Sequence, residues 1–521
     1  NEERLWISNL IYLPNAPIAQ IPLEVDPGNI LFSDFDIKDF FELIFSRRPP
    51  IPSGEQIVFQ AMKLEMFDSK IQEWIEKLSA TIDISPLDKK KIERLSEVVL
   101  KGQGYDEKLG DQLLIYRGRG GTGKTFKLLN IAKNIYDKKE TKRILILTYN
   151  KSLVAEIRRL LAMMKIKDDP EESIQIMSVY QFWYKIFWRV GITNNEDDSG
   201  FDKFPEFKSK LLAFLDNSKK SGIFDSIVYT NYDLLHWNFV MIDEAQDWPN
   251  DERDLIYKLF GPNKVIIADG MDQFVRNREA CSWEGSREVK KHQIVTLRKS
   301  LRQKSNLTRF IKEVSNKLEF SDWDVEDNAD NYGGSVVIVE GEYTKDVHDY
   351  LVNMNSTAEN KNIDFLFCVP PNDMDKYNDN SWIASKLINW DCQVWDGVKD
   401  YVRQRGYATS SDSFRIVQYD SCRGLEGWIC VNINFDRFFD YKLNTYKDKG
   451  GQTLLLNEDQ IAKFQKEKIL FAKRWLLIPL TRAMDTIVIT IQNSNSFMGK
   501  MLGEIYQDNK EYIKCINTKD R

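Results

Sequence analysis

The sequence predicts an α/β protein with two domains in series, and three observations support this fold class. Short apolar runs of strand length alternate with helical patterns in a first set at 113–116, 144–148, 174–177, 238–242 and 264–268. A second alternating set follows at 335–339, 363–369, 392–395, 414–418, 428–433 and 486–491. No internal repeat or low-complexity tract interrupts either set. This alternation is typical of parallel sheets with helices on both faces, because their strands are buried and apolar throughout.

Two stretches fall outside the alternation. Residues 1–105 form a region of their own, with a strand-like run at 5–14 and helical patterns at 71–78 and 89–100, and we expect an α+β accessory region there. It contains no chemical constellation, and its three lysines at 89–91 are interpreted as a solvated helix face rather than a nucleic-acid patch. The stretch at about 160–236 holds an aromatic segment and a polar loop, and predicts an inserted subdomain.

The bulk composition excludes several classes of protein. A chain of 521 residues has room for about three domains, and its 42% hydrophobic and 29% charged residues are ordinary for a globular protein. The net charge of −6 argues against a globally basic nucleic-acid coat but is compatible with a local basic groove. The six cysteines lack a C-x-x-C pair, which favours reduced cytosolic thiols over a zinc or iron–sulfur site. Because no apolar run approaches about 18 residues and no signal peptide opens the chain, we expect a cytoplasmic protein without a membrane span.

The first chemical motif follows the apolar run at 113–116. Residues 118–125 match G-x-x-x-x-G-K-T and lead into a helical pattern from Phe126. The loop residues expected to surround phosphates are Gly118, Gly120, Gly121, Thr122 and Gly123. Lys124 is expected to reach the β- and γ-phosphates, and Thr125 to offer its hydroxyl to Mg²⁺. The alternative, a glycine-rich turn before a helix, explains less because every specified position is matched in strand–loop–helix order. The motif predicts a nucleoside triphosphate site for ATP with Mg²⁺.

The second motif is Asp-Glu-Ala-Gln-Asp at 243–247, after the apolar run at 238–242. A buried strand would deliver Asp243 to the magnesium ion, and Glu244 beside it would orient and deprotonate the attacking water. The alternative is an acidic loop at the end of a strand. The phosphate-binding motif on the same predicted sheet favours the catalytic interpretation.

Together with further motifs along the chain, these two give the sequence a resemblance to superfamily 1 helicases of the UvrD/Rep type. The motifs that carry the resemblance are, in order, 118–125, 144–151, 174–180, 243–247, 268–273, 297–302, 421–426 and 480–484. The resemblance spans about 112–492 and implies two RecA-like P-loop NTPase domains in tandem, at 106–296 and 297–521. The inserted helical subdomain belongs to the first of them. Only about 115 residues separate the motifs at 302 and 421, so we expect no large insertion in the second domain.

The resemblance also implies roles for individual residues. Gln273 would couple the γ-phosphate to nucleic acid, Arg302 and Arg482 would stabilise the transferred phosphate, and Glu426 would contact the ribose. An arginine by itself is more often a partner in a surface salt bridge, and these two are assigned to the site only because they follow the two strong motifs in order. The residues expected to contact nucleic acid are Thr148, Asn150, Lys151, Ser178, Tyr180, Phe274 and Ser421.

The sequence departs from the family pattern at four places. The spacing from Asp269 to Gln273 is one residue longer than usual, and the base-stacking aromatic is absent, which leaves Phe274 or Trp283 as substitutes. Leu301 replaces the tyrosine that packs on adenine, so selectivity for ATP is left open. Gln103 has a plausible spacing for the adenine-reading glutamine, but its surroundings do not match.

The expected function is an ATP-dependent DNA helicase or translocase, moving 3′ to 5′ on single-stranded DNA. The forms at 117–125 and 147–153 and the segment at 10–15 are most similar to prokaryotic helicases fused behind a nuclease-related (NERD) domain. We therefore expect a nuclease domain upstream of Asn1 or on a partner, and a role in bacterial DNA processing or anti-phage defence. Two alternatives are a nucleotide-gated switch that licenses a nuclease partner, and an RNA-directed ATPase.

Overall fold

The computed structural model describes residues 11–13, 30–32, 84–100, 108–138, 142–164, 166, 174–193, 203–271, 281–320, 323–327, 331–371, 374–375, 380–399, 402, 408, 410–446 and 458–519. The chain divides into two units, Asn1–Glu73 and Trp74–Arg521. In the first unit, strands β1 (Ile11–Leu13) and β2 (Ile30–Phe32) pair in parallel. Most of the predicted accessory region, including the helical pattern at 71–78 and Gln103, lies outside the described residues.

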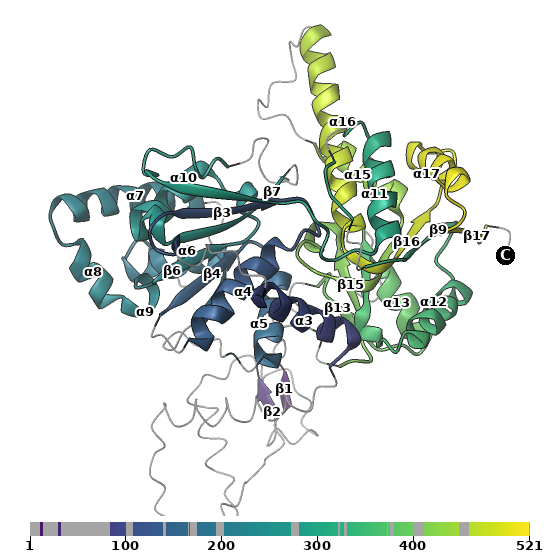
Figure 1. Cartoon of the computed structure of the whole chain (residues 1–521), viewed down its shortest axis with the longest axis horizontal. Helices are drawn as coiled ribbons and strands as arrows, with labels where there is room; N and C mark the ends of the chain where they lie inside the picture. Colours follow the sequence, from purple (N-terminus) through teal and green to yellow (C-terminus); the bar gives the residue numbers. More distant parts are fainter. Residues whose placement is uncertain are drawn as a thin grey trace, which may run out of the picture. The chain divides into compact units, whose positions relative to one another are not determined.

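The second unit is an α/β structure with two parallel sheets, which confirms the predicted fold class at this level (Figure 1). The six-stranded sheet has the order β5-β4-β6-β7-β3-β8. Its strands are β3 (Leu113–Gly118), β4 (Ile144–Thr148), β5 (Ile174–Ser178), β6 (Phe239–Ile242), β7 (Val265–Gly270) and β8 (His292–Leu297). Every strand pairing in this sheet is parallel. The carboxyl ends of its strands therefore meet at one edge, where ligands of open α/β sheets bind.

Both faces of the six-stranded sheet are covered by helices. Alternate residues of β3 show the period of a strand: Leu113 and Ile115 pack in one apolar cluster, Leu114 and Tyr116 in another. The first cluster is completed by helices α6 (Val179–Arg189), α7 (Phe204–Lys220) and α10 (Asn250–Phe260). The second is completed by α4 (Lys124–Asp137) and α5 (Lys151–Met163), on the opposite face of the sheet (Figure 1). Two buried faces explain why these strands are apolar throughout.

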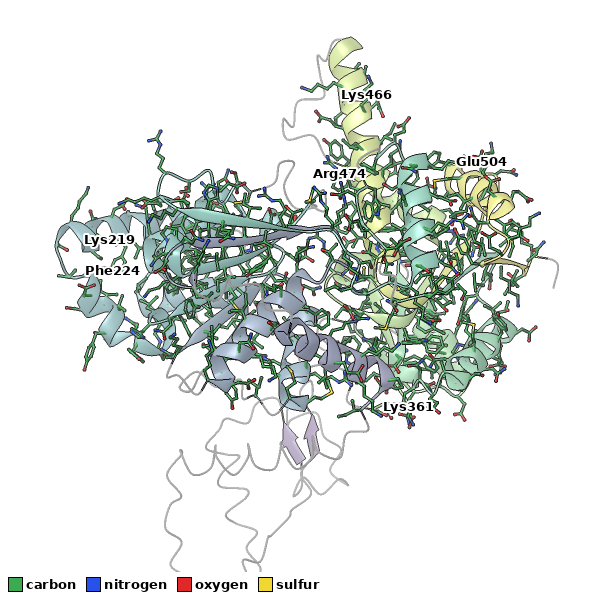
Figure 2. The ribbon with its side chains drawn as sticks, viewed as in Figure 1. Lys219, Phe224, Lys361, Lys466, Arg474 and Glu504 are labelled. Carbon is green, nitrogen blue, oxygen red and sulfur yellow. The ribbon has the colours of Figure 1, made fainter. Side chains whose placement is uncertain are left out.

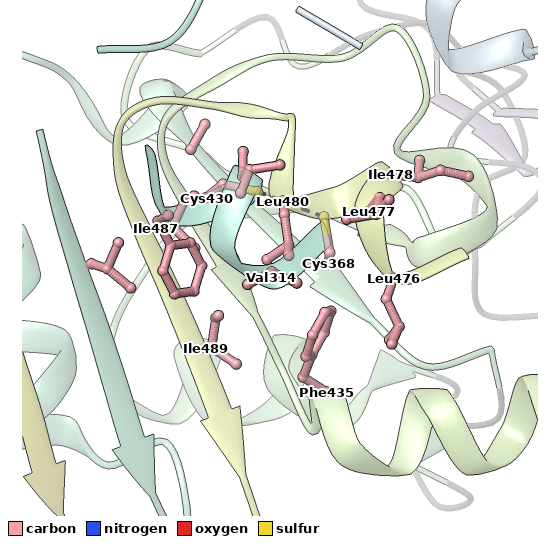
Figure 3. Packing of buried hydrophobic residues seen from close by; sticks show 14 of the residues in the cluster. Val314, Cys368, Cys430, Phe435, Leu476, Leu477, Ile478, Leu480, Ile487 and Ile489 are labelled. Atoms are coloured by element: carbon pink, nitrogen blue, oxygen red, sulfur yellow. Dashed lines mark hydrogen bonds between the residues drawn. The ribbon is translucent and has the colours of Figure 1, made fainter. Parts of the chain in front are cut away.

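The seven-stranded sheet has the order β13-β14-β10-β15-β16-β9-β17 and is also parallel throughout. Its strands are β9 (Ser335–Glu340), β10 (Phe365–Val369), β13 (Val394–Asp396), β14 (Phe414–Gln418), β15 (Gly427–Asn432), β16 (Ala483–Ile491) and β17 (Ile513–Asn517). Helices α11 (Ser305–Lys317), α15 (Phe435–Thr445), α16 (Glu458–Leu480) and α17 (Phe497–Asp508) cover one face. Figure 3 shows this packing, with Val314, Phe435 and Leu476 of three helices meeting Cys368 and Ile489 of the sheet. Helices α12 (Lys345–Thr357) and α13 (Trp382–Asn389) cover the other face.

Helices fill most of the stretch predicted as an insertion. Between β5 and β6 the chain forms α6 and α7, then α8 (Phe224–Thr230) and α9 (Tyr232–Leu235). Lys219 and Phe224 mark the turn from α7 to α8, where the ammonium group lies 5.0 Å from the ring centroid (Figure 2). No helix in the described part of the chain combines the length and the apolarity that crossing a membrane requires.

Helix α3 (Pro86–Leu100) precedes β3 and packs against an apolar cluster of each of the two sheets. Its Leu87 belongs to an apolar cluster of the seven-stranded sheet, and its Leu95 to one of the six-stranded sheet. The expectation of a solvated lysine face here was wrong for Lys91, which is 2% exposed and pairs with Glu156 of α5. Lys90 is half-buried, with its ammonium 4.3 Å from the ring centroid of Trp428. The sequence alone predicts a solvated run of lysines because their partners, the Glu156 carboxylate and the Trp428 ring, lie far away along the chain.

Candidate nucleotide site

The loop at 118–125 leaves the carboxyl end of β3 and enters α4. Gly121 and Gly123 both have φ of 85°, a left-handed conformation that favours glycine. A Cβ atom at Gly123 would lie 2.5 Å from Cδ1 of Leu301, and one at Gly118 would lie 2.6 Å from the carbonyl oxygen of Leu297. The Leu301 amide also donates to the Gly121 carbonyl over 3.0 Å. The glycines are therefore required by the backbone path and by the close approach of residues 297–301.

Lys124 begins α4 and is buried at the centre of the loop. Its Nζ donates to the Arg119 carbonyl oxygen over 3.0 Å, and the Thr122 hydroxyl donates to the same oxygen over 2.9 Å. Burial lowers the pKa of Lys124, while the carboxylates of Glu244 and Asp243 oppose that effect. The ammonium group thus lies in a desolvated loop at a helix N-terminus, where an anion is stabilised by the amide dipoles as well as by the charge.

Thr125 and Asp243 meet at the carboxyl ends of β3 and β6. The Thr125 hydroxyl donates to Oδ2 of Asp243 over 2.7 Å, and the Glu244 amide donates to Oδ1 over 2.9 Å. Burial, followed by the neighbouring Glu244 charge, raises the pKa of Asp243 to about 6. Within the described residues no group of three or more His, Cys, Asp or Glu side chains is placed to hold a metal. A hydroxyl and one carboxylate fit Mg²⁺, which takes few protein ligands and completes its shell with water and phosphate oxygens.

Glu244 is held in an unusual conformation by its neighbours. Its φ of 52° lies in the left-handed region, which is uncommon for a residue other than glycine. Its Oε2 accepts a hydrogen bond from Nε2 of Gln246 over 2.6 Å, and Oε1 of Gln246 accepts from the Gly270 amide over 2.7 Å. Burial acts to raise the pKa of Glu244, but Arg423 and Lys124 outweigh it and the pKa lies below its ordinary value. Glu244 is therefore an ionised acceptor with a fixed orientation.

Two arginines approach from the seven-stranded sheet. Arg302 donates to Oε1 of Glu426 and to the Thr481 carbonyl oxygen, both over 2.6 Å. Arg482 donates to the Ile478 carbonyl over 3.0 Å and to the Thr481 hydroxyl over 2.8 Å. Burial, and then the nearby Arg302 charge, lower the pKa of Arg482 to about 10. Burial acts to raise the pKa of Glu426, yet Arg302 and Arg94 hold it at about 2.

One pocket brings these groups together. Its lining residues are Gly120, Gly121, Gly123, Lys124, Thr125, Phe126, Glu244, Arg302, Gly424 and Arg482. Three cationic side chains and one carboxylate thus face a single space, to which Asp243 is joined through Thr125. Such a space suits a polyphosphate whose charge is neutralised from both sides. Gln273, the other predicted catalytic residue, lies outside the described residues.

A buried ion pair beside this pocket was not predicted from the sequence. Arg423, in the loop between β14 and β15, pairs with Asp247, in the loop after β6; the two side chains are 8% and 1% exposed. Nδ2 of Asn150 also donates to the carbonyl oxygens of Ser421 (3.0 Å) and Arg423 (2.6 Å). The loops after β4, β6 and β14 are therefore joined by charged and polar contacts. Arg423 and Gln246 lie inside motifs that the sequence revealed, but their partners became apparent only in the structure.

The predicted nucleic-acid residues lie in different environments. Thr148 is fully buried, and the Ser178 hydroxyl caps α6 by accepting from the Gln181 amide over 3.3 Å. Tyr180 packs against Tyr149 with ring centroids 5.6 Å apart. Lys151 and Ser421 are half-buried. Asn150 and Ser421 are brought together, as described above, whereas Thr148 and Ser178 present no accessible side chain.

The two candidates for a base-stacking aromatic have different outcomes. Trp283 is 1% exposed, and its indole N–H donates to the Ala245 carbonyl oxygen over 2.9 Å. The prediction that Trp283 could stack on a base was therefore wrong, because its ring is part of the core that supports the loop at 243–247. Phe274 lies outside the described residues.

A scan against protein-family models and a search of curated proteins found no match for this chain. The interpretation of the site therefore depends on its own residues and geometry.

Proposed function

We propose that this protein binds and hydrolyses ATP with Mg²⁺ and couples the cycle to single-stranded DNA, as a helicase or translocase of the superfamily 1 type. One observation carries the proposal. Lys124, Thr125 and Glu244 from the six-stranded sheet line one pocket together with Arg302 and Arg482 from the side of the seven-stranded sheet. The two sheets would then correspond to two RecA-like domains.

The chemistry assigned to each residue follows from its surroundings. The loop amides and Lys124 would hold the β- and γ-phosphates, while Thr125 and Asp243 would hold Mg²⁺, which neutralises phosphate charge. Ionised Glu244, fixed by Gln246, would accept a hydrogen bond from the attacking water. Arg302 and Arg482 would stabilise charge that develops on the γ-phosphate oxygens, where preorganised cations in a desolvated site are most effective.

The composite pocket supports a link between the nucleotide cycle and domain movement. A triphosphate held by loops of one sheet and by arginines of the other would favour the closed arrangement, and loss of the γ-phosphate would weaken it. The Asp247–Arg423 pair and the Asn150 contacts lie on the same boundary and would respond to that movement. A strand of nucleic acid bound across both sheets would be moved by the cycle.

A nucleotide-gated switch is the second candidate. The environments of Thr148 and Ser178 favour it. Both residues were expected to contact nucleic acid, but Thr148 is buried and the Ser178 hydroxyl caps helix α6. In this alternative the closed state would bind and license a nuclease partner. An RNA-directed ATPase, the third candidate, is distinguished by its preferred polymer.

The test is ATP hydrolysis by the full chain with no polymer, with a single-stranded DNA oligonucleotide and with the matched RNA. We expect DNA to raise turnover many-fold and Lys124→Ala to abolish it, since the ammonium group is at the centre of the loop. Lys89→Ala, which alters an exposed lysine of α3, is the matched control and should leave turnover unchanged. Stimulation by RNA alone would indicate the RNA-directed ATPase. Slow turnover that ignores both polymers would contradict the motor and favour the switch.

A further inference from the structure

The loop at 419–426, between β14 and β15, contacts two parts of the nucleotide site. Near its carboxyl end, Glu426 accepts a hydrogen bond from Arg302 over 2.6 Å. Three residues earlier, Arg423 forms an ion pair with Asp247. Asp247 ends the turn that begins with Glu244, the residue proposed to orient the attacking water. A single loop beside the seven-stranded sheet therefore contacts one of the two arginines and the turn that carries Glu244.

The path of this loop is fixed against helix α5 of the six-stranded sheet. Gly424 has a φ of 73°, and a Cβ atom there would lie 2.5 Å from Cδ2 of Leu153. Nδ2 of Asn150, the residue that caps α5, donates to the Arg423 carbonyl oxygen over 2.6 Å. The backbone of Arg423 is thus held in place, and its side chain reaches Asp247 from a defined position.

A short path connects Asp247 to Glu244. The turn between them is the 3₁₀ helix η5 (Ala245–Asp247), and the Asp247 amide donates to the Glu244 carbonyl oxygen over 3.2 Å. Within the six-stranded sheet, an amide of β7 holds Gln246 over 2.7 Å. Arg423 holds the same turn from the other sheet. The left-handed conformation of Glu244 is unfavourable for its residue type and persists only where its surroundings fix it.

The ion pair exists only while the two sheets are closed on one another, because each sheet supplies one of its charges. The Arg423 and Asp247 side chains are 8% and 1% exposed. Separating such a pair leaves buried charges uncompensated, which is strongly unfavourable. The contact therefore responds to closure, and the turn that carries Glu244 receives that response through Asp247.

We propose that Arg423 is a positioning residue that makes the orientation of Glu244 depend on closure of the two sheets. In the closed arrangement Arg423 fixes Asp247 and its turn, while Glu426 of the same loop holds Arg302. When the sheets separate, Arg423 and Arg302 withdraw together, so water is oriented only when the arginine faces the phosphate. This inference rests on the proposed ATP hydrolysis and extends it, because it assigns coupling to a contact outside the residues found to line the phosphate pocket.

The first test separates ATP affinity from turnover in the double variant Asp247→Asn/Arg423→Gln of the full chain. Both replacements are neutral and can hydrogen-bond to each other, so no buried charge is left unpaired. We expect ATP to bind with Mg²⁺ within about twofold of the unaltered chain while turnover falls about a hundredfold, the scale for a misplaced catalytic group. Unchanged turnover, or equal losses of affinity and turnover, would overturn the inference.

The second test asks whether Arg423 acts through Asp247. Arg423→Gln alone should lose about as much turnover as the double variant, because both break the same contact. Arg423→Lys keeps the positive charge and should recover most of the turnover. Losses of the two single variants that multiply in the double variant would show independent roles. A lysine variant as slow as Arg423→Gln would equally contradict positioning by the ion pair.

The control is a second buried ion pair of the same kind. Asp88 of α3 accepts two hydrogen bonds from Arg159 of α5, and the two side chains are 2% and 11% exposed. Asp88→Asn/Arg159→Gln should keep the turnover of the unaltered chain, and an equal loss here would show that any buried pair has this effect. Failure of the unaltered chain to hydrolyse ATP would overturn the proposed function itself. An active chain whose Asp247→Asn/Arg423→Gln variant matches it would overturn this inference alone.

Discussion

Asp243 is the residue whose environment most directly reflects what the site is built to bind. It lies at the carboxyl end of β6, 1% exposed, next to Glu244 and within reach of the Thr125 hydroxyl. Burial and the neighbouring Glu244 charge raise its pKa to about 6, although Thr125, the Glu244 amide and Lys124 act to lower it. A divalent cation between Asp243 and phosphate oxygens would do so, because a bound metal is the largest local charge in such a site.

The pKa of Asp243 leads to a prediction about stability. Between pH of about 4 and 6 the folded protein binds a proton that the unfolded chain has released, so stability falls as pH rises through that window. Asp243→Asn should therefore stabilise the nucleotide-free protein at pH 7 by about 1–3 kcal/mol, with no gain at pH 3. Thermal unfolding at both pH values measures this, with exposed Asp349→Asn as the control. Destabilisation at pH 7 would contradict the raised pKa of Asp243.

Individual residues also show what the sequence can predict. Lys124, Thr125, Asp243 and Glu244 were identified because a strand, a glycine loop and a helix must follow one another for phosphate binding. The roles of Gln246 and Arg423 escaped prediction because a hydrogen bond to Gly270 and an ion pair with Asp247 depend on how distant loops meet. Trp283 was misjudged for the same reason, since an aromatic residue in a loop gives no indication of its burial.

At the scale of elements, all interior strands of the two large sheets were predictable, whereas two of their four edge strands were not. Every strand predicted from 113 onward has a counterpart in one of the two sheets. The strands missed in these sheets were β8 and β17, which lie at sheet edges. The two-residue strands β11 (Met374–Asp375) and β12 (Asn380–Ser381), which pair with each other outside them, were missed as well. The sequences of β8 and β17, HQIVTL and IKCIN, lack a continuous apolar run, and β8 alternates between more and less exposed positions. The apolar run is a signal of burial on both faces, so it disappears where one face or edge is open.

Helix α3 provides an element-scale prediction, because the Asp88–Arg159 contact fastens it to α5. Burial acts to raise the pKa of Asp88, but Arg159 and Lys91 hold it at about 2, below its ordinary 3.8. The contact thus contributes fully above pH of about 4 and is lost as pH falls through 2. Asp88→Asn should cost about 2 kcal/mol at pH 7 and progressively less as pH falls below 4. Denaturant unfolding across that range tests this, and a cost independent of pH would contradict the ion pair as its cause.

At the scale of the whole second unit, the two sheets share the residues of one site. The loops of the six-stranded sheet supply Lys124, Thr125 and Glu244, and the segments flanking the seven-stranded sheet supply Arg302 and Arg482. The Asp247–Arg423 pair crosses the same boundary. The order of motifs along the chain predicted two domains, but only the structure shows which side chains meet between them.

In the proposed function, the arginines beside the seven-stranded sheet serve catalysis at a nucleotide bound by loops of the six-stranded sheet. The most direct test measures the turnover and the ATP affinity of Arg482→Gln. Arg482 lines the pocket, and its side chain donates to Ile478 and Thr481 of its own segment. The phosphate loop is unaltered in this variant, so we expect ATP to bind with Mg²⁺ while turnover falls by about a thousandfold or more. Arg309→Gln, an exposed arginine of α11, should behave as the unaltered protein. Turnover of Arg482→Gln within about twofold of the unaltered protein would contradict the claim.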